Sequence, residues 1–206
     1  MPVEITWLGH ASIMITNGSR TVYIDPWKVR KGLPKADLIL VTHGHSDHYS
    51  PEDITMLSGS DTLVLAPEAM PQVTDVIPVG RSFSYEGITV KAVPAYNISK
   101  QFHPKAKGWV GYIVGIDGRT IYHAGDTDHI PEMDDLDVDA ALIPVGGTYT
   151  MDEEEAAGAA RAMRARALIP IHFGDIVGSK ENAERFSRIA GTETHILDPG
   201  QSYVLS

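Results

Sequence analysis

One short stretch of the chain concentrates side chains that bind metal ions. In VTHGHSDHYS, residues 41–50, three histidines and an aspartate fall within six positions: His43, His45, Asp47 and His48. Neutral imidazole is a good ligand for zinc, iron or manganese, and a carboxylate broadens that choice. Alternate residues of an extended loop point the same way, so we expect His43 and His45 to hold one ion. Asp47 and His48 then lie within reach of a second.

A solvated, histidine-rich loop is the competing interpretation of this stretch. Crowded imidazoles repel one another when protonated and serve no packing purpose, which favours a metal site. Two later segments supply partners: YHAGDTD (122–128) places Asp126 after an apolar run, and PIHFGD (170–175) places His172 after another. A carboxylate at Asp126 could bridge two ions. Taken singly, each of these two residues is more typical of an ordinary turn or loop than of a metal site.

The elements that must position these side chains are mostly strands. ADLILVTH (36–43) is a continuous apolar run that ends at the histidine cluster, as in a buried central strand. Asp117-Gly118 predicts a hairpin turn. Ligand segments that share the order strand, ligand, glycine are expected at one edge of the sheets. Further strands are predicted over 3–8, 12–16, 21–25, 62–66, 75–79, 87–93, 109–116, 119–124, 139–146 and 167–175, with short strands in 194–205.

Helices are predicted over 50–59, 150–166 and 179–191. Ser50 and Ser179 are candidate N-caps, Thr150 and Glu153 have capping-box spacing, and Gly191 follows the last helix. Early hairpins followed by strand–helix–strand units predict an α/β chain with two mixed sheets packed together and helices outside.

Length and composition limit the class of protein. The chain has 206 residues, enough for one domain, and a formal net charge of −10, which disfavours binding to nucleic acid or anionic membranes. It has no cysteine, so disulfides and thiolate ligands are excluded. We expect neither a signal peptide nor a membrane span, and therefore a cytoplasmic protein with a small-molecule substrate. A homo-oligomer is compatible with the sequence.

The motifs together resemble those of a known family. HGHSDH matches the HxHxDH signature of the metallo-β-lactamase fold hydrolases, and AGDT and IHFG match later elements of that superfamily in the same order. WLGHAS, YIDP and PVGGTYTMD are similar to a narrower group of small hydrolases, akin to ascorbate-6-phosphate lactonases and N-acylphosphatidylethanolamine-hydrolysing phospholipases. The resemblance spans the whole chain. It implies a single domain over 1–206 with a four-layer αββα sandwich (α/β, or α+β, class) and a dinuclear metal site at one edge, between the sheets.

The resemblance also implies roles for individual residues. The first metal would be held by His43 and His45, the second by Asp47, His48 and His172, with Asp126 as the bridge. A further histidine is expected on the first metal, but Asn97 stands at its place in VPAYNISKQFHP (93–104). Three alternatives are open: His103 reaches in from the following loop, Asn97 binds through its amide oxygen, or the first site is weak. We slightly favour His103.

These residues predict a metal-dependent hydrolase. Two divalent ions, zinc or alternatively manganese or iron, would acidify a water to a pKa of about 7, and the water would attack an ester, lactone or phosphodiester. Asp47 and Asp126 are the expected catalytic residues. The alternative is a metal-binding or sensing protein without turnover, its first site weakened by Asn97.

Several other residues remain open at this level. His10 and Asp25 could orient metal-bound imidazoles, and His123 is expected to be a buried, hydrogen-bonded strand residue. Aromatic side chains could line a pocket or belong to the core, and a basic run could meet an anionic substrate or lie in a solvated loop. The aromatic residues are Phe102, Trp109 and Tyr149, and the basic ones are Lys28, Arg30, Lys31 and Lys35.

Overall fold

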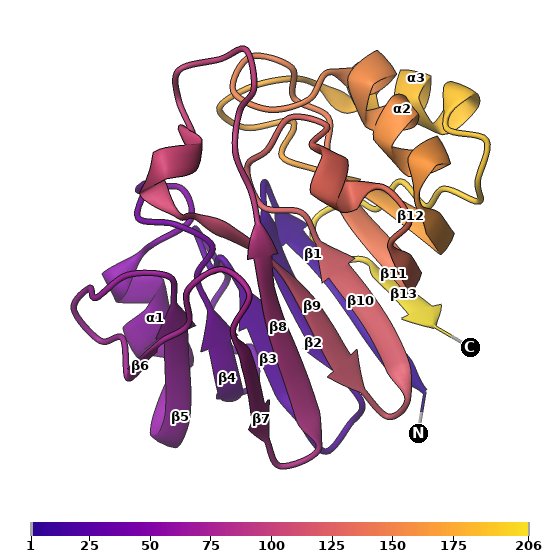
Figure 1. Cartoon of the computed structure of the whole chain (residues 1–206). Coiled ribbons are helices and arrows are strands. Elements are labelled where there is room, and N and C mark those ends of the chain that lie inside the picture. Colours follow the sequence, from indigo (N-terminus) through magenta and orange to yellow (C-terminus); the bar gives the residue numbers. More distant parts are fainter. Residues whose placement is uncertain (1, 206) are drawn as a thin grey trace.

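The first strands of the chain and its last strand form a seven-stranded sheet. The computed structural model describes residues 2–205, and Figure 1 shows this sheet packed against a second one. Its strands are β1 (Val3–Gly9), β2 (Ser12–Thr16), β3 (Thr21–Ile24), β4 (Ala36–Leu40), β5 (Ser58–Ala66), β6 (Asp75–Val76) and β13 (Ser202–Leu205). The spatial order is β13-β1-β2-β3-β4-β5-β6, and the strands from β3 to β6 run parallel.

The second sheet has six strands from the middle of the chain. They are β7 (Ser82–Tyr85), β8 (Ile88–Pro94), β9 (Val110–Ile116), β10 (Arg119–His123), β11 (Asp137–Pro144) and β12 (Arg164–Ile171), in the order β12-β11-β10-β9-β8-β7. β10, β11 and β12 are parallel, and the other pairs are antiparallel. At the β9–β10 hairpin, Asp117 and Gly118 both have positive φ, as the sequence predicted.

Burial on both faces explains the continuous apolar run of β4. Leu38 and Leu40 belong to the core between the sheets, whereas Ile39 and Val41 lie in the cluster under α1 (Pro51–Leu57). Because successive strand residues point to opposite faces, a strand covered on both sides carries apolar residues at every position.

Helices cover the outer faces of the two sheets. α1 packs Ile54 and Leu57 on the first sheet, while α2 (Glu153–Ala162) and α3 (Lys180–Ile189) pack on each other and on β12 (Figure 1). Two short 3₁₀ turns, η1 (Lys105–Lys107) and η2 (Pro131–Met133), lie in loops. The predicted arrangement of two mixed sheets with helices outside is therefore confirmed. None of the helices within 2–205 has the length and apolar character that crossing a membrane requires.

Helix ends agree with the sequence at α1 and α3 but not at α2. Ser50 accepts from the Asp53 N–H, and Asn182 Oδ1 accepts from the Ser179 N–H. The predicted cap at Thr150 is wrong: Asp152 accepts from the backbone of the first turn of α2, and Thr150 lies buried outside the helix. Glu153 instead contacts α3 through Asn182, at 2.9 Å.

The limits of two predicted elements are also corrected, and one strand was not predicted. The helix predicted over 150–166 ends at Ala162, because residues from Arg164 onward pair in parallel with β11. The strand β7 was not predicted, since alternation over only four residues is a weak signal. Of 194–205, only Ser202–Leu205 forms a strand, where it pairs with β1.

The direction of the strands brings the ligand-bearing loops to one rim. β1, β3 and β4 run in one direction in the first sheet, and β8, β10 and β12 share one direction in the second. The loops that follow these strands contain all the candidate ligands. The sheet order, more than any single loop, therefore decides where the site lies.

The substitution Gly111→Ala tests whether β9 and β10 lie in close contact near this rim. A Cβ at Gly111 would lie 2.6 Å from the carbonyl oxygens of His123 and Ala124, so backbone must move. We expect a loss of about 2 kcal/mol in the free energy of unfolding, as for other overpacked cores, measured by urea denaturation of the metal-free protein. Gly59→Ala is the matched control, because its Cβ would make only ordinary contacts at 3.8 Å and beyond. Equal stability of the two variants would contradict the proposed contact.

Candidate metal centre

Three histidines from two loops form the first group of candidate ligands. His43 and His45 follow β4, and His103 comes from the loop after β8. His43 Nε2 lies 3.0 Å from His45 Nδ1, and the ring of His103 is 5.1 Å from each of the other two rings. One nitrogen from each residue lies within 4.8 Å of the others, a spacing suited to a shared ion. Trp109 packs against His43 and His45 at 4.9 and 4.8 Å, so it forms a wall of this group.

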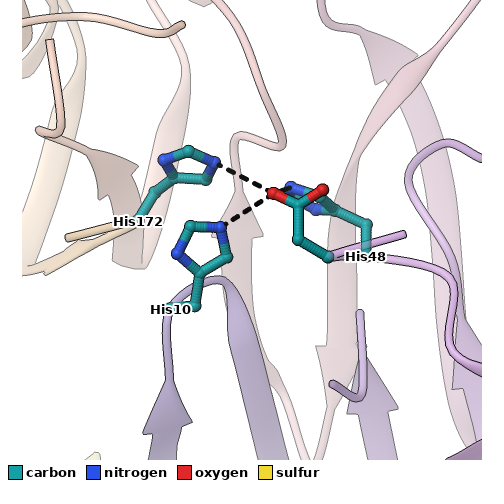
Figure 2. Close-up of side chains that lie close together, drawn as sticks. His10, His48 and His172 are labelled. Carbon is teal, nitrogen blue, oxygen red and sulfur yellow. Dashed lines mark hydrogen bonds and ion pairs between the residues drawn. The ribbon is translucent and has the colours of Figure 1, made fainter. Parts of the chain in front are cut away.

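Asp47, His48 and His172 form a second group, which also contains His10. Figure 2 shows the imidazoles of His10, His48 and His172 turned toward one region between the sheets. Asp47 Oδ2 lies 3.5 Å from His48 Nε2, 4.0 Å from His172 Nε2 and 3.0 Å from His10 Nε2. The sequence anticipated that His10 would orient an imidazole; its Nε2 contacts the Asp47 carboxylate instead, while its ring packs on His172 at 4.0 Å.

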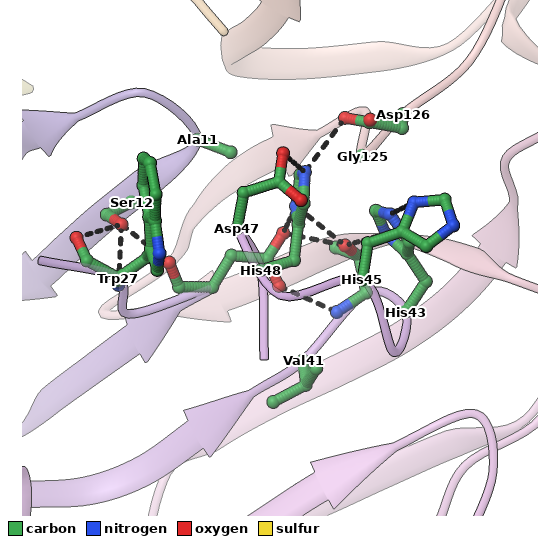
Figure 3. Close-up of polar contacts among 12 residues, drawn as sticks. Ala11, Ser12, Trp27, Val41, His43, His45, Asp47, His48, Gly125 and Asp126 are labelled. Carbon is green, nitrogen blue, oxygen red and sulfur yellow. Dashed lines mark hydrogen bonds and ion pairs between the residues drawn. The ribbon is translucent and has the colours of Figure 1, made fainter. Parts of the chain in front are cut away.

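Asp126 lies between the two groups. Its Oδ2 is 3.1 Å from both His103 Nε2 and His172 Nε2, and its Oδ1 is 3.3 Å from His48 Nε2. Figure 3 shows Asp126 and Asp47 both facing His48. Gly125 makes this position accessible: its φ is +66°, and a Cβ there would lie 2.7 Å from the Val110 carbonyl oxygen.

Polar atoms at the centre lack hydrogen-bond partners among the described residues. Although they lie near one another, these atoms are buried and make no hydrogen bond of proper geometry: Nε2 of His48, His103 and His172, and Oδ1 of Asp126. Buried polar groups without partners are rare because they lose their hydration without compensation. A metal ion would satisfy all of them, and imidazole nitrogens with carboxylate oxygens suit zinc, iron or manganese. The residues present therefore fit a metal centre.

Asp25 fixes the orientation of His48, as expected from the sequence. Asp25 Oδ2 lies 2.7 Å from His48 Nδ1, and its two oxygens accept from the backbone N–H and the hydroxyl of Thr42 at 2.7 and 2.6 Å. A carboxylate that accepts from Nδ1–H leaves the Nε2 lone pair free for a metal. Thr42 was not singled out in the sequence, although it directly precedes His43.

The structure distinguishes the positions of Asn97 and His103. The amide oxygen of Asn97 accepts from the His103 N–H at 2.9 Å and lies 3.1 Å from its Nδ1. Its amide nitrogen donates to Asp128 and to the Tyr149 carbonyl. Both ends of the Asn97 side chain are thus engaged in hydrogen bonds, whereas His103 lies beside His43 and His45 in the first group.

Asp128 holds the loop that carries His103. Its carboxylate accepts from Lys100 Nζ at 2.6 Å and from the Ile98 and Ser99 N–H groups at 2.8 and 3.3 Å. Burial raises the pKa of Asp128, but the bonds from Lys100 and the two backbone groups outweigh it, so the pKa is lower than usual. Sequence reasoning missed this residue, although it lies in the YHAGDTD segment beside Asp126.

Burial favours the neutral forms of His43 and His45. It lowers the pKa of His43 well below its usual value, and the neighbouring His48 lowers it further. Burial and His103 lower the pKa of His45. Neutral imidazoles have a free lone pair, so these two residues bind a cation without first losing a proton.

The carboxylates around His48 stabilise a positive charge at its position. Burial opposes protonation of His48, but the carboxylates of Asp126 and Asp25 outweigh it and hold the pKa of His48 well above its usual value. Burial likewise raises the pKa of Asp126, yet His172 and His48 outweigh it, and the pKa is well below its usual value. A cation therefore suits this position, whether it is a proton or a metal ion.

Three site residues have a strained backbone. His10, Asp25 and His172 have φ values of 50°, 48° and 59°, in the left-handed region that side chains with a Cβ rarely adopt. The His10 carbonyl accepts from the His172 N–H and the Trp7 indole at 2.8 and 2.9 Å, which holds two of these residues together. Such strain is common at functional sites.

His123 has the structural role expected of it. It is fully buried, its Nε2 lies 2.9 Å from the Ala11 carbonyl oxygen, and its Nδ1 accepts from the Gly125 N–H at 3.2 Å. Its side chain therefore ties β10 to the first sheet beside the centre.

The loop support given by Asp128 is tested by Asp128→Asn in metal-free protein. We expect a loss of about 2 kcal/mol in the free energy of unfolding at pH 7, because a hydrogen-bonded buried charge is removed. The pKa of Asp128 is lowered by folding, so the difference from wild type is full above about pH 4 and shrinks as pH falls through that lowered pKa. Urea denaturation over a pH series measures both effects.

The control is Asp198→Asn, which breaks the exposed ion pair with Lys180 at 2.8 Å. Exposed pairs contribute little, so we expect a change below about 0.5 kcal/mol. If Asp128→Asn were as mild as the control at pH 7, Asp128 would not support the loop.

Proteins of known families are similar to this chain in sequence. The family model described as "Beta-lactamase superfamily domain" matches residues 4–172. A protein of Thermus thermophilus named "UPF0173 metal-dependent hydrolase" is 32% identical over 97% of both chains. A protein of Thermoplasma acidophilum with the same family name is 36% identical over 96% of this chain and 95% of that one.

A solved structure extends the comparison to the fold. A crystal structure from Parabacteroides distasonis has a TM-score of 0.84 and 35% identity, covering 94% of this chain and 92% of that one. Together with the family model and the curated relatives, it shows that the chain belongs to the metallo-β-lactamase superfamily, in the group named UPF0173 metal-dependent hydrolases.

Proposed function

We propose that the chain is a metal-dependent hydrolase that holds two divalent ions and cleaves an ester, lactone or phosphodiester bond in a small molecule. The observation that carries the proposal is the position of Asp126, 3.1 Å from imidazole nitrogens of both ligand groups. A carboxylate placed between two sets of nitrogen ligands is suited to bridge two cations. The name of the curated relatives supports the same type of reaction here.

The assignment of ligands follows the two groups. We assign the first ion to His43, His45 and His103, and the second to Asp47, His48 and His172, with Asp126 between them. Asn97 is assigned to orient His103. The donor set is rich in imidazole, and we propose zinc, with manganese or iron as alternatives that metal analysis distinguishes.

When bound, divalent ions supply Lewis acidity, which lowers the pKa of a water to about 7 and polarises the bond under attack. Asp47 borders the cavity beside the ligands. Burial raises its pKa, but the hydrogen bond with His10 and the nearby His48 imidazole outweigh it, so the pKa is held well below its usual value. Asp47 is therefore ionised at neutral pH and can accept a hydrogen bond from the attacking water, which orients it.

Direct attack by water is favoured over a covalent intermediate. The chain has no cysteine, and neither serine nor threonine lines the cavity within residues 2–205. Since a covalent mechanism needs an activated nucleophile within reach of the substrate, the available groups favour a single displacement. The alternative of metal binding without turnover rested on Asn97 as a defect of the first site, and the position of His103 beside His43 and His45 argues against such a defect.

Variants that lack one of the central metal ligands should bind less metal. We expect His45→Ala and Asp126→Ala to bind fewer than two ions per chain and to lose ester and phosphodiester hydrolysis together, because both residues are assigned to the ions themselves. Metal analysis of the purified variants and assays with aryl esters and a bis-aryl phosphodiester measure both properties. His129→Ala is the control, since His129 contacts Asp134 outside the two groups. Full metal content in either ligand variant would refute the assignment.

Separate replacement of His103 and Asn97 identifies the third ligand of the first ion. We expect His103→Ala to lose about one of the two ions, whereas Asn97→Ala keeps the ligand and weakens the affinity of the first site roughly 10- to 100-fold, as for other residues that orient a ligand. Metal titration of each variant gives the affinities. A greater loss in Asn97→Ala than in His103→Ala would make Asn97 the ligand.

A further inference from the structure

A small cavity opens beside the candidate metal ligands. Its volume is about 210 Å³, and it is bordered on one side by ligands of both groups, including His45 and Asp126. On the other side its wall is formed by Phe102, Tyr149 and Ile176. A molecule that reaches the ligands through this cavity must therefore contact an apolar surface.

Two of these wall residues are unusually exposed for apolar side chains. Phe102 is 46% exposed and Ile176 49%, although they lie on different loops, after β8 and after β12. Phe102 meets the Tyr149 ring edge-on at 4.7 Å, which holds it at the cavity. Apolar groups that gather at the mouth of a site mark a place where a ligand removes them from water.

The wall of the cavity carries no positive charge. Neither lysine nor arginine lines it within the described part of the chain: two lysines of the flanking loops face carboxylates, and Lys107 lies over the Trp109 ring at 5.8 Å. Lys100 lies 2.6 Å from Asp128, and Lys28, from the basic run noted in the sequence, lies 3.1 Å from Asp175. An anionic group on the substrate, away from the reacting bond, would find no cation there and would lose its hydration without compensation.

The volume limits the size of the ligand. Pockets for drug-sized molecules measure about 300–1,000 Å³, so 210 Å³ is below that range. A short acyl chain fits this space, whereas a nucleotide or a phospholipid would extend far out of its open mouth.

We propose that the substrate is a small, uncharged carboxylic ester or lactone whose acyl chain is short and apolar, and that Phe102 and Ile176 determine this preference. The inference rests on the proposed hydrolase function and chooses among its bond classes. One water is consumed: its oxygen bonds to the acyl carbon, and the acyl C–O bond breaks. The oxygen stays with the carboxylic acid, and the alcohol leaves with a proton from that water.

Binding of hydroxamates to the metal-loaded full-length protein tests the pocket without turnover. Acetohydroxamate, butanohydroxamate and succinic monohydroxamate share the metal-binding group and differ in the chain that enters the cavity. Burial of each CH₂ contributes about 0.8 kcal/mol, or about fourfold, so we expect butanohydroxamate to bind about 15-fold more tightly than acetohydroxamate. The succinic compound, with a terminal carboxylate, should bind at least tenfold more weakly than butanohydroxamate. Isothermal titration calorimetry gives the dissociation constants.

Variants connect the preference to the cavity wall. Phe102→Ala and Ile176→Ala should each reduce the butano- to acetohydroxamate affinity ratio at least threefold. Ile189→Ala is the matched control, because Ile189 is also exposed, at 42%, but lies at the end of α3. A ratio unchanged in both wall variants, equal or tighter binding of the succinic compound, or no measurable hydroxamate binding would overturn the inference.

Hydrolysis of the matching p-nitrophenyl esters separates this inference from the proposed function. Acetate, butanoate and hemisuccinate esters are compared with bis-p-nitrophenyl phosphate. We expect the butanoate to have the highest kcat/KM. If hydroxamates bind as expected but neither the esters nor the phosphodiester are cleaved, the hydrolase proposal fails while the apolar pocket stands. If the esters are cleaved without preference for the apolar chain, or only the phosphodiester is cleaved, the substrate class is wrong and the hydrolase proposal stands.

Discussion

A buried carboxylate surrounded by imidazoles is the constraint on which the site depends. Asp126 lies within 3.3 Å of nitrogens from His48, His103 and His172, which come from three other segments of the chain. A charge removed from water must be paired, so these segments have to meet within a few ångströms. The turn at Gly125 and the parallel strands beneath it make that meeting possible, and the rest of the fold can be understood as support for it.

Much of the fold was accessible from sequence because the strongest signals are local. The continuous apolar run of β4 reflects burial on both faces, and the caps at Ser50 and Ser179 form within single turns. The end of α2 was not accessible in this way. Arg164 leaves the helix to pair with Asp137 of β11, a contact between residues 27 positions apart that helical periodicity does not contain.

The candidate site shows the same division between local and distant information. The spacing of His43, His45, Asp47 and His48 was sufficient to indicate a metal site, because neighbours in a loop stay neighbours in space. The sequence favoured His103 but did not fix its position, since this position depends on the hydrogen bond that the His103 N–H donates to Asn97 and on the anchoring of the loop by Asp128. His10 was recognised as a candidate, but its contact with Asp47 joins the β1–β2 turn to the loop after β4, which only the folded sheet brings together.

The loop anchored by Asp128 gives the two halves of the centre different mechanical support. His172 directly follows β12, and the Asp25 carboxylate fixes the ring of His48 three residues before α1, whereas His103 lies on the long connection between β8 and β9. Local opening of proteins begins in loops and leaves packed strands closed. Release of the Lys100–Asp128 contact would therefore detach one histidine from the first group while the second keeps its geometry, and under the proposed assignment of two ions the first group would release its ion before the second.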